Sequence, residues 1–372
     1  MKKLYVGAAM LAMSATGPVF AQSSITLYGV VDTGLEFITH ASPQGGTLTR
    51  FPSISAGDLP SRWGLRGSED LGGGLKAVFT LESGFAPGTG SSLQNGRLFG
   101  RQSFVGFSGQ WGQVTLGRQM NMTMWGMANA DVIGPADISM GSFDGYLSAA
   151  RDDNSIAYRG TFSNFTIGAS YSFGRDSQSA GNCGGQLPGD MVSCRAITAM
   201  VKYDDARWGA ALIFDEQRGG PGATAMSVIP GLPGIAFTKP GSTDRRYQAN
   251  GYFLLGSVKI AGGWIHREVA GDIQTVRTDL TYLGTSIPYG VWVFDAQVSH
   301  ISNHDQDANG TLGEARANYN LSKRTSVYGL VGYLHNSGKN AVYSVSSSSI
   351  VPAMPEPGVG QAEIGVGVRH LF

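Results

Sequence analysis

Apolar and polar residues alternate with a period of two through most of this 372-residue chain. The alternation is clear in the closing stretch "AEIGVGVRHLF", where Ala362, Ile364, Val366, Val368 and Phe372 occupy every second position apart from His370. A period of two predicts a β-strand with one apolar face and one polar face. We therefore expect the last strand to run to the terminal phenylalanine.

The same supersecondary unit returns along the chain. A strand of about ten residues leads through a very short turn into a second strand, and a longer polar loop follows. The clearest example is "SRWGLRGSEDLGGGLKAVFTLESGF". Seven such hairpins, together with the opening "SITLYGVVDTGLEF" and the closing strand, predict about sixteen strands in an antiparallel, all-β arrangement.

Soluble sandwiches are also built from many short strands, but three features favour a barrel in an outer membrane. The strands have a single apolar face, as expected where that face meets lipid and the inside is wet. The short turns and the long loops lie at opposite ends. Aromatic residues fall mostly near strand ends, where an interfacial girdle would need them; they include Tyr28, Trp63, Trp111, Trp208, Trp264, Tyr289 and Trp292.

The N-terminal stretch predicts export. "MKKLYVGAAMLAMSATGPVFA" has two lysines, an apolar run and a small-residue cleavage site, which is typical of a signal peptide ending at Ala21. We therefore divide the chain into a signal peptide over residues 1–21 and a barrel domain over residues 22–372. After residue 21 no apolar run is long enough for a transmembrane helix.

Charge and cysteine content narrow the class further. Removing the signal peptide takes away Lys2 and Lys3 from 27 basic residues and leaves all 27 acidic residues, so no electrostatic signature of a nucleic-acid partner is present. Cys183 and Cys194 lie close together in a Gly/Pro-rich stretch, which in an exported protein predicts a local disulfide. The alternative is a thiol metal site, but no histidine lies nearby to complete it.

With these residues in view, the chain resembles the Gram-negative general porins, in particular the trimeric sixteen-strand porins of betaproteobacteria. The matching stretches are "SSITLYGVVDTGLE", "SRWGLRGSEDLGGGLKAVFTLESGF", "RQSFVGFSGQWGQVTLGRQ", "NSIAYRGTFSNFTIGASYSFG" and "GVGVRHLF". The resemblance implies a transmembrane β-barrel in the outer membrane, surrounded by lipid and lipopolysaccharide. It also implies a homotrimer, a water-filled pore with loop 3 folded into each lumen, and recognition of the strand ending at Phe372 by the barrel-assembly machinery.

Strand parity and the resemblance together suggest which residues line the narrowest part of the pore. In "SRWGLRGSED" the apolar residues face outward, which turns Arg62 inward, and the same reasoning turns Arg151 and Arg159 inward. Arg101 lies on a neighbouring strand. The direction of Arg118 is ambiguous, because it has the same parity as Val114 and Leu116, which face outward. A kink where the chain enters loop 3 would turn this arginine inward, as the resemblance implies.

Loop 3 corresponds to "MNMTMWGMANADVIGPADISMGSFDGYLSAARDD", which is rich in methionine and small residues and lacks the acidic tight turn of the enteric porins. It offers Asp131, Asp137 and Asp144 opposite the arginines. Arginines facing carboxylates create a transverse field that orients a passing solute. The alternative role for some of these arginines is a salt bridge that holds loop 3 in place.

We therefore expect a passive channel for small hydrophilic solutes and ions, with a modest anion preference because the arginines sit on rigid strands. We expect no catalytic residue, cofactor or metal, since HExxH, GxSxG and P-loop motifs are absent from the sequence. Two alternatives stay open. An outer-membrane hydrolase would lose activity on substitution of His300 or His304 by alanine, whereas a pore would still conduct. An adhesin or receptor would use the long loops.

Overall fold

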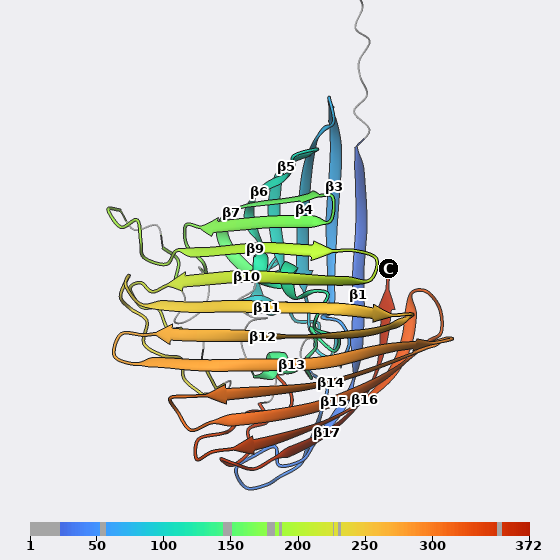
Figure 1. The fold of residues 1–372 in the computed structure, drawn as a ribbon, viewed down its shortest axis with the longest axis vertical. Helices are drawn as coiled ribbons and strands as arrows, with labels where there is room; N and C mark the ends of the chain where they lie inside the picture. Colours follow the sequence, from blue (N-terminus) through green and yellow to red (C-terminus); the bar gives the residue numbers. More distant parts are fainter. Residues whose placement is uncertain are drawn as a thin grey trace, which may run out of the picture.

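A computed structural model describes residues 23–52, 57–143, 151–176, 183–185, 188–225, 227–229, 232–347 and 352–372. The strands form one sheet of seventeen, which wraps around a common interior (Figure 1). The shortest strand, β2, has three residues and pairs beside the end of β1. The remaining sixteen strands form a closed antiparallel barrel, which confirms the predicted fold class.

Strands account for nearly all of the regular structure. Their bounds are β1 Ser24–Ile38, β2 Leu48–Arg50, β3 Arg62–Gly72, β4 Leu75–Gly84, β5 Gln102–Gly109, β6 Gly112–Met120, β7 Arg151–Phe162, β8 Phe165–Ser172, β9 Ala196–Asp204, β10 Trp208–Arg218, β11 Thr243–Leu255, β12 Val258–Ala270, β13 Thr275–Tyr289, β14 Trp292–Asn303, β15 Asn309–Asn320, β16 Thr325–Ser337 and β17 Gln361–Leu371. The helical elements are α1 Leu93–Gly96, α2 Met122–Met127 and the 3₁₀ turn η1 Met140–Ser142. Across the described ranges no helix has the length and apolarity needed to cross a membrane.

The barrel closes where β17 pairs with β1. The register runs from Val30 opposite Leu371 to Ile38 opposite Glu363. Beyond that ladder, Gly29 and Phe372 exchange two backbone hydrogen bonds of 3.0 and 3.1 Å. The ring of Phe372 packs directly over Gly29, because a Cβ atom placed there would lie 2.3 Å from the Cζ atom of the phenylalanine. The closing aromatic residue thus requires a glycine on the first strand.

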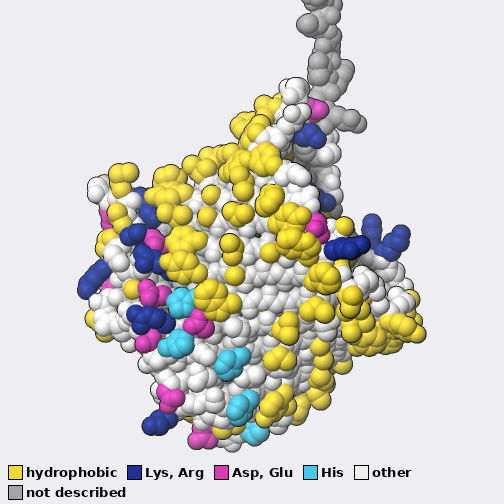
Figure 2. All heavy atoms as spheres, in the orientation of Figure 1, with side chains coloured by type: hydrophobic (Ala, Val, Ile, Leu, Met, Phe, Trp, Pro, Cys, Tyr) yellow, Lys and Arg dark blue, Asp and Glu magenta, His cyan; other side chains and the backbone are white. Residues whose placement is uncertain are grey.

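The distribution of side chains is the inverse of a soluble protein. On β16, Val331 and Tyr333 are more than half exposed, whereas Leu334 on the alternate face is fully buried. Large apolar side chains cover the outer surface (Figure 2), while fully buried positions include Arg246 and Arg267. This is the pattern expected of a barrel whose apolar face meets lipid. Four of the aromatic residues predicted for the girdle are well exposed on strand ends or turns: Trp111, Trp208, Tyr289 and Trp292. Trp264 is also exposed, but it lies in the middle of β12.

Tight turns join the strands at one end of the barrel. β3 and β4 turn through Gly73 and Gly74, whose positive φ angles of 62° and 81° favour glycine. At the other end, long connections follow β4, β6, β8, β10 and β16. The connections after β12 and β14 span only 271–274 and 304–308, so the expected asymmetry fails there. The strands that flank these short connections, β11–β16, have 12 to 15 residues, compared with 8 or 9 in β5, β6, β8 and β9. In that region the barrel wall is therefore extended by longer strands rather than by long loops.

The predicted disulfide is confirmed. Cys183 and Cys194 are joined with their Cα atoms 5.0 Å apart, and both are buried beside Ala223. The amide of Cys194 donates to the carbonyl of Gly219 at 2.9 Å. The disulfide closes the connection after β8 on itself, and the Cys194–Gly219 bond and the packing on Ala223 hold it against the connection after β10. The predicted signal peptide lies outside the described residues, so that boundary stays a prediction.

Replacing Gly29 with leucine tests the closure. The new side chain meets both the Phe372 ring and the carbonyl of Arg62, whose oxygen would lie 2.7 Å from Cβ. We expect a loss of about 1–3 kcal/mol in the free energy of unfolding, measured by urea titration in phospholipid vesicles. Gly313→Leu is the matched control, because a Cβ atom there meets nothing within 4 Å. Equal urea midpoints for the two variants would contradict this account of the closure.

Candidate functional site

The connection between β6 and β7 makes a long series of contacts with the buried face of the wall. Its described part is called here segment 121–143. At its start, Asn121 and Thr123 both donate to Oδ2 of Asp215 on β10, at 3.2 and 3.0 Å. The amide of Met122 donates to the Thr198 hydroxyl on β9. The Met122 side chain packs in an apolar cluster with residues of β7, β9 and β10.

The middle of segment 121–143 reaches β11, β13 and β14. The Sδ atom of Met127 accepts from Asn250 and from the hydroxyl of Tyr282, at 3.6 and 3.7 Å. Gln297 on β14 then makes two bonds to the segment: its Nε2 donates to Asp131 at 3.1 Å, and its Oε1 accepts from the amide of Val132 at 3.2 Å. The wall thus bonds to Met127, Asp131 and Val132 in the middle of the segment.

Arg316 on β15 clamps two loops at once. Its guanidinium donates to the carbonyls of Val132 and Ile133 at 3.2 and 2.9 Å, and to the carbonyl of Gly57 in the connection before β3 at 2.7 Å. The charge is balanced by Asp295, which accepts at 2.8 and 3.1 Å. Only 7% of this side chain is exposed. The five donors and fixed geometry of arginine suit such multiple bonding.

The far end of segment 121–143 packs against β16 and the connection between β16 and β17. Ile138 is fully buried with Tyr328 and Leu330. The Phe143 ring makes an edge contact with Tyr343 at a centroid distance of 5.3 Å. Since the start of the segment contacts β9 and β10, its described residues follow the buried face of the wall from β8 to β16. The other arc, β3–β7, carries the predicted arginines.

Arg62 and Arg101 converge on one carboxylate. Glu82 on β4, which is buried, accepts from Nε of Arg101 at 2.7 Å and lies 3.5 Å from Nε of Arg62. The hydroxyl of Tyr28 donates to the other oxygen of Glu82 at 2.9 Å. Arg101 is buried, while 22% of the Arg62 side chain is exposed. The structure therefore brings these two arginines together through an acid that the sequence analysis did not single out.

Arg118 turns inward through a break in the strand pairing. The register between β6 and β7 shifts between Gly117 and Gln119, and Gly117 has a φ of 133°. Arg118 then donates to the carbonyl of Gly100 at 2.7 Å and to Asp153 at 2.6 Å. The side chain of Arg118 therefore does not follow the parity of Val114 and Leu116, while its place at a constriction stays a prediction. Asp153 also accepts from Arg97, which bonds Asp176 at 2.7 Å.

Arg151 and Arg159 occupy different environments. Arg151, at the start of β7, interacts electrostatically with Arg101, Arg118 and Glu82. Arg159 lies eight residues further along β7, and its guanidinium stacks on the Trp125 ring of segment 121–143 at 3.4 Å. Within the described residues no carboxylate lies in ion-pair distance of Arg159. The first four predicted arginines thus form one group, and Arg159 stands apart from it.

Two of the three predicted acids of loop 3 lie in the described part of the chain. Asp131 accepts from Gln297 and from the amide of Gly134, and its side chain is half-buried. Asp137 has no exposed surface, and its backbone carbonyl accepts from Ser347. Asp144 lies outside the described residues. The carboxylates of Asp131 and Asp137 are therefore anchored in the loop packing rather than aligned on an open surface.

Sequence reasoning missed Glu82, Arg97 and Arg316, although the inward parity of Glu82 in "LESG" was a usable signal. Arg97 and Arg316 gave no comparable signal, because their partners come from residues far away in the sequence. The set Arg62, Arg97, Arg101, Arg118 and Arg151 with Glu82, Asp153 and Asp176 is called here the arginine cluster. It holds five arginines and three carboxylates.

Asp272, in the four-residue connection after β12, ties down the long connection after β10. Its carboxylate accepts from the hydroxyl and amide of Thr238, from the Ser242 hydroxyl and from the Lys239 amide, at 2.6 to 3.2 Å. These bonds, led by the Thr238 hydroxyl, lower the pKa of Asp272 to about 2. The anchor therefore stays ionised at physiological pH. In the part of the chain described, no group of three or more acidic, histidine or cysteine side chains is arranged to hold a metal ion.

Comparison with known proteins gives a consistent result. The sequence model of a Gram-negative porin family matches residues 7–339. An outer membrane porin protein of Bordetella pertussis is 32% identical, and outer membrane porin protein 32 of Delftia acidovorans is 31% identical, each with full coverage of both chains. Among solved structures, an anion-selective porin from Comamonas acidovorans has a TM-score of 0.77 and 26% identity, and the match covers 94% of this chain and all of that one.

Removing the clamp tests its role in holding segment 121–143. Arg316→Met leaves Asp295 without its buried arginine partner, whereas Asp58 keeps its ion pair with Arg369. We expect a loss of about 3–5 kcal/mol in the free energy of unfolding, and faster chymotrypsin cleavage at Trp125. Arg277→Met is the control, because that arginine is 47% exposed and its ion pairs contribute about 1 kcal/mol or less. Cleavage at wild-type rate in Arg316→Met would show that the segment does not depend on the clamp.

Proposed function

The chain belongs to the Gram-negative porin family, and on that premise we propose that it is a passive channel for small hydrophilic solutes and ions with a constriction built by segment 121–143. Its place is the outer membrane, where its relatives are outer membrane porins. Passive diffusion requires no bond chemistry. The residues of such a channel set the width and the electric field of its narrowest part.

The observation that carries the proposal is the path of segment 121–143. It bonds to the buried side of the wall at β9, β10, β14 and β15, through Thr198, Asp215, Gln297 and Arg316. We infer that this segment folds into the lumen and narrows it. The passage then runs between the segment and the arc β3–β7. Arg62, Arg118, Arg151 and Arg159 belong to that arc.

The charge balance of the arc supports a modest anion preference. The arginine cluster has two more arginines than carboxylates, and Arg159 adds a cation that stacks on Trp125. Low-dielectric walls strengthen the resulting field, and arginine stays charged at any relevant pH. The Comamonas structure described as an anion-selective porin agrees with this sign. On this proposal Glu82 and Asp153 hold the arginines in place and reduce the net field.

We also propose a homotrimer, because one of the similar folds, OmpT of Vibrio cholerae, was solved in a trimer form. The strand that ends in Phe372 is proposed as the contact for the barrel-assembly machinery, since it forms the closing seam with β1. Lipid and lipopolysaccharide are the expected surroundings of the apolar outer face.

A hydrolase is the second candidate, because a serine–histidine contact exists on the outer face. Nε2 of His300 lies 3.2 Å from the Ser302 hydroxyl, and Nδ1 lies 2.8 Å from the Thr311 hydroxyl. In a catalytic triad the third group is a carboxylate that stabilises the imidazolium ion. A neutral threonine hydroxyl occupies that position here, so the geometry favours the channel.

Substitution at this contact separates the two functions. We expect His300→Ala to leave the single-channel conductance within error of wild type, because the histidine faces away from the lumen. His304→Ala, which removes a partner of Asp279, is the comparison variant. A wild-type esterase activity on a phospholipid that either change abolishes would favour the hydrolase instead.

Selectivity is tested by the reversal potential in planar bilayers under a salt gradient. We expect the reversal potential of the wild-type protein to indicate anion preference. In Arg62→Ala/Arg101→Ala we expect the permeability ratio to shift towards cations by about twofold or more, because Glu82 then faces the lumen without its arginines. Arg277→Ala, outside the lumen, controls for a general loss of charge. A double variant with the wild-type reversal potential would reduce these arginines to supports for the loops.

A further inference from the structure

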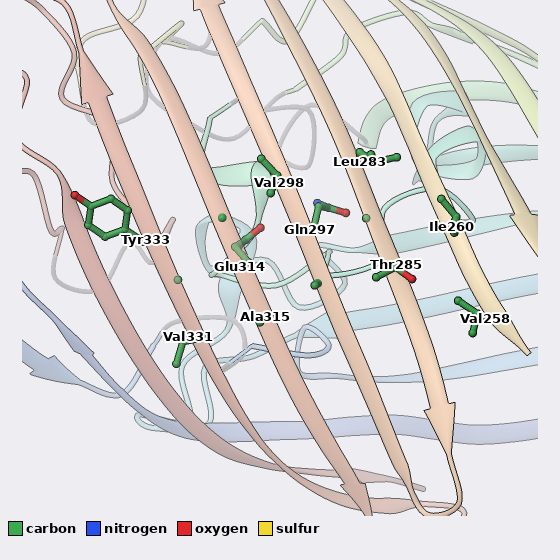
Figure 3. A pocket seen from close by; sticks show the side chains of 14 residues that line it. Val258, Ile260, Leu283, Thr285, Gln297, Val298, Glu314, Ala315, Val331 and Tyr333 are labelled. Carbon is green, nitrogen blue, oxygen red and sulfur yellow. The ribbon is translucent and has the colours of Figure 1, made fainter.

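The outer surface of the barrel is hollowed over β12–β16. Figure 3 shows this hollow, with Leu283, Val298, Val331 and Tyr333 around it, and its volume is about 660 Å³. A second hollow of about 480 Å³ extends it towards β17, sharing Thr285, Ala296, Ala315 and Val331 in its lining. The two together form one apolar groove, called here the outer groove.

Small side chains on two neighbouring strands create the groove. On β15 the outward positions are Gly313, Ala315 and Ala317, and on β16 Gly329 stands opposite Ala317. Larger residues flank them, with Val298 and Tyr333 on either side of Gly313. Because the flanking outward side chains Val298, Val331 and Tyr333 are larger, the floor of the groove lies below its rims.

A polar row crosses the wall immediately beyond one end of the groove. Its register is Thr281 opposite His300, His300 opposite Thr311, and Thr311 opposite His335. It lies two residues beyond the row of Leu283, Val298, Gly313 and Tyr333, which is about 7 Å along a strand. All four residues of the polar row are imidazoles or hydroxyls. In Figure 2 the histidines gather in this region, beside the band of apolar side chains.

The nearest carboxylate beyond the polar row is already occupied. Asp279 accepts from Trp264 at 2.7 Å and pairs with His266 and His304 at 2.9 and 2.7 Å. Further towards the rim, Arg277 pairs with Glu268 and lies 3.8 Å from Asp305. The two ring nitrogens of His300 form hydrogen bonds with the hydroxyls of Thr311 and Ser302. The polar row thus carries imidazole and hydroxyl groups without a carboxylate of its own.

We propose that the outer groove holds an acyl chain of a phosphorylated lipid of the outer leaflet, with its phosphate bound at the polar row of Thr281, His300, Thr311 and His335. This inference rests on the proposed function for its orientation, because short turns are periplasmic and long loops are extracellular in outer-membrane barrels. The polar row then lies on the extracellular side of the apolar groove. An outer-leaflet lipid has the same order, with its phosphate outside and its acyl chains inside.

The shape and the polarity both select a lipid over a second subunit. The wall of a neighbouring barrel is convex, and two convex walls meet along their ridges rather than in a groove whose floor is glycine and alanine. A flexible acyl chain follows such a floor. The change from apolar groove to polar row along the strands also matches one amphipathic molecule.

Two glycines provide variants that fill the groove without disturbing the barrel. A Cβ atom at Gly313 meets nothing within 4 Å, and one at Gly329 meets only a backbone oxygen at 4.0 Å. Gly313→Leu/Gly329→Leu therefore fills the outer groove. Ala199→Leu instead adds a leucine to the outer face of β9, away from the groove, where Ile197 and Val201 are already exposed. His300→Ala/His335→Ala removes the imidazoles and leaves the groove open.

The test is native mass spectrometry of the purified full-length protein titrated with bisphosphorylated lipid A and with the same lipid after removal of its phosphates. We expect wild type and Ala199→Leu to retain bisphosphorylated lipid A equally, and Gly313→Leu/Gly329→Leu to retain about tenfold less. His300→Ala/His335→Ala is expected to bind the two lipids alike, whereas wild type prefers the phosphorylated one.

The outcomes separate this inference from the proposed function, because the bilayer conductance of each variant is recorded from the same preparations. Equal retention by wild type and the groove-filled variant overturns the lipid site while the channel stands. Dissociation of the groove-filled variant into monomers, visible in the same spectra, assigns the groove to a subunit interface instead. Release of fatty acid by wild type would replace binding with hydrolysis. Loss of conductance in folded wild-type protein refutes the channel itself.

Discussion

The constraint on which this structure depends is that no strand edge can face lipid without hydrogen-bonding partners. The seam between β1 and β17 meets it, from Ile38 opposite Glu363 to the two backbone bonds between Gly29 and Phe372. Once the sheet is closed, alternate side chains must point either to lipid or to the interior. That requirement explains why leucine and valine are exposed here while arginine and glutamate are buried. The lumen is polar because the barrel closes, and a polar lumen is what a channel requires.

The charged side chains on the inner face of the barrel still need partners, and the two arcs of the wall provide these partners differently. Along β8–β16 the wall groups are engaged by segment 121–143, with Arg316 bonding Val132, Ile133 and Asp295. Along β3–β7 the five arginines of the arginine cluster share three carboxylates. One arc therefore holds a loop in place, and the other carries a residual positive charge. In the proposed channel, the first arc sets the width of the passage and the second sets its field.

Much of the fold followed from the sequence because a period of two is a local signal. The strand number, the tight turns, the closing strand and the Cys183–Cys194 disulfide were all predictable, and the inward turn of Arg118 required only a kink at Gly117. The charge partners were not predictable. Glu82 could have been found from parity, but Arg316 bonds Gly57 and Ile133 across 259 and 183 residues. The short connections after β12 and β14 were also missed, since strand length compensates for them only in three dimensions.

The most direct test of the channel is solute entry into liposomes containing the folded wild-type protein. Swelling rates measured with neutral sugars of increasing size report the width of the passage without relying on charge. A passage narrowed by segment 121–143 predicts fast entry of monosaccharides and a steep fall for larger sugars. Rates equal to those of protein-free liposomes for every sugar would contradict the channel. Rates independent of sugar size would contradict the constriction.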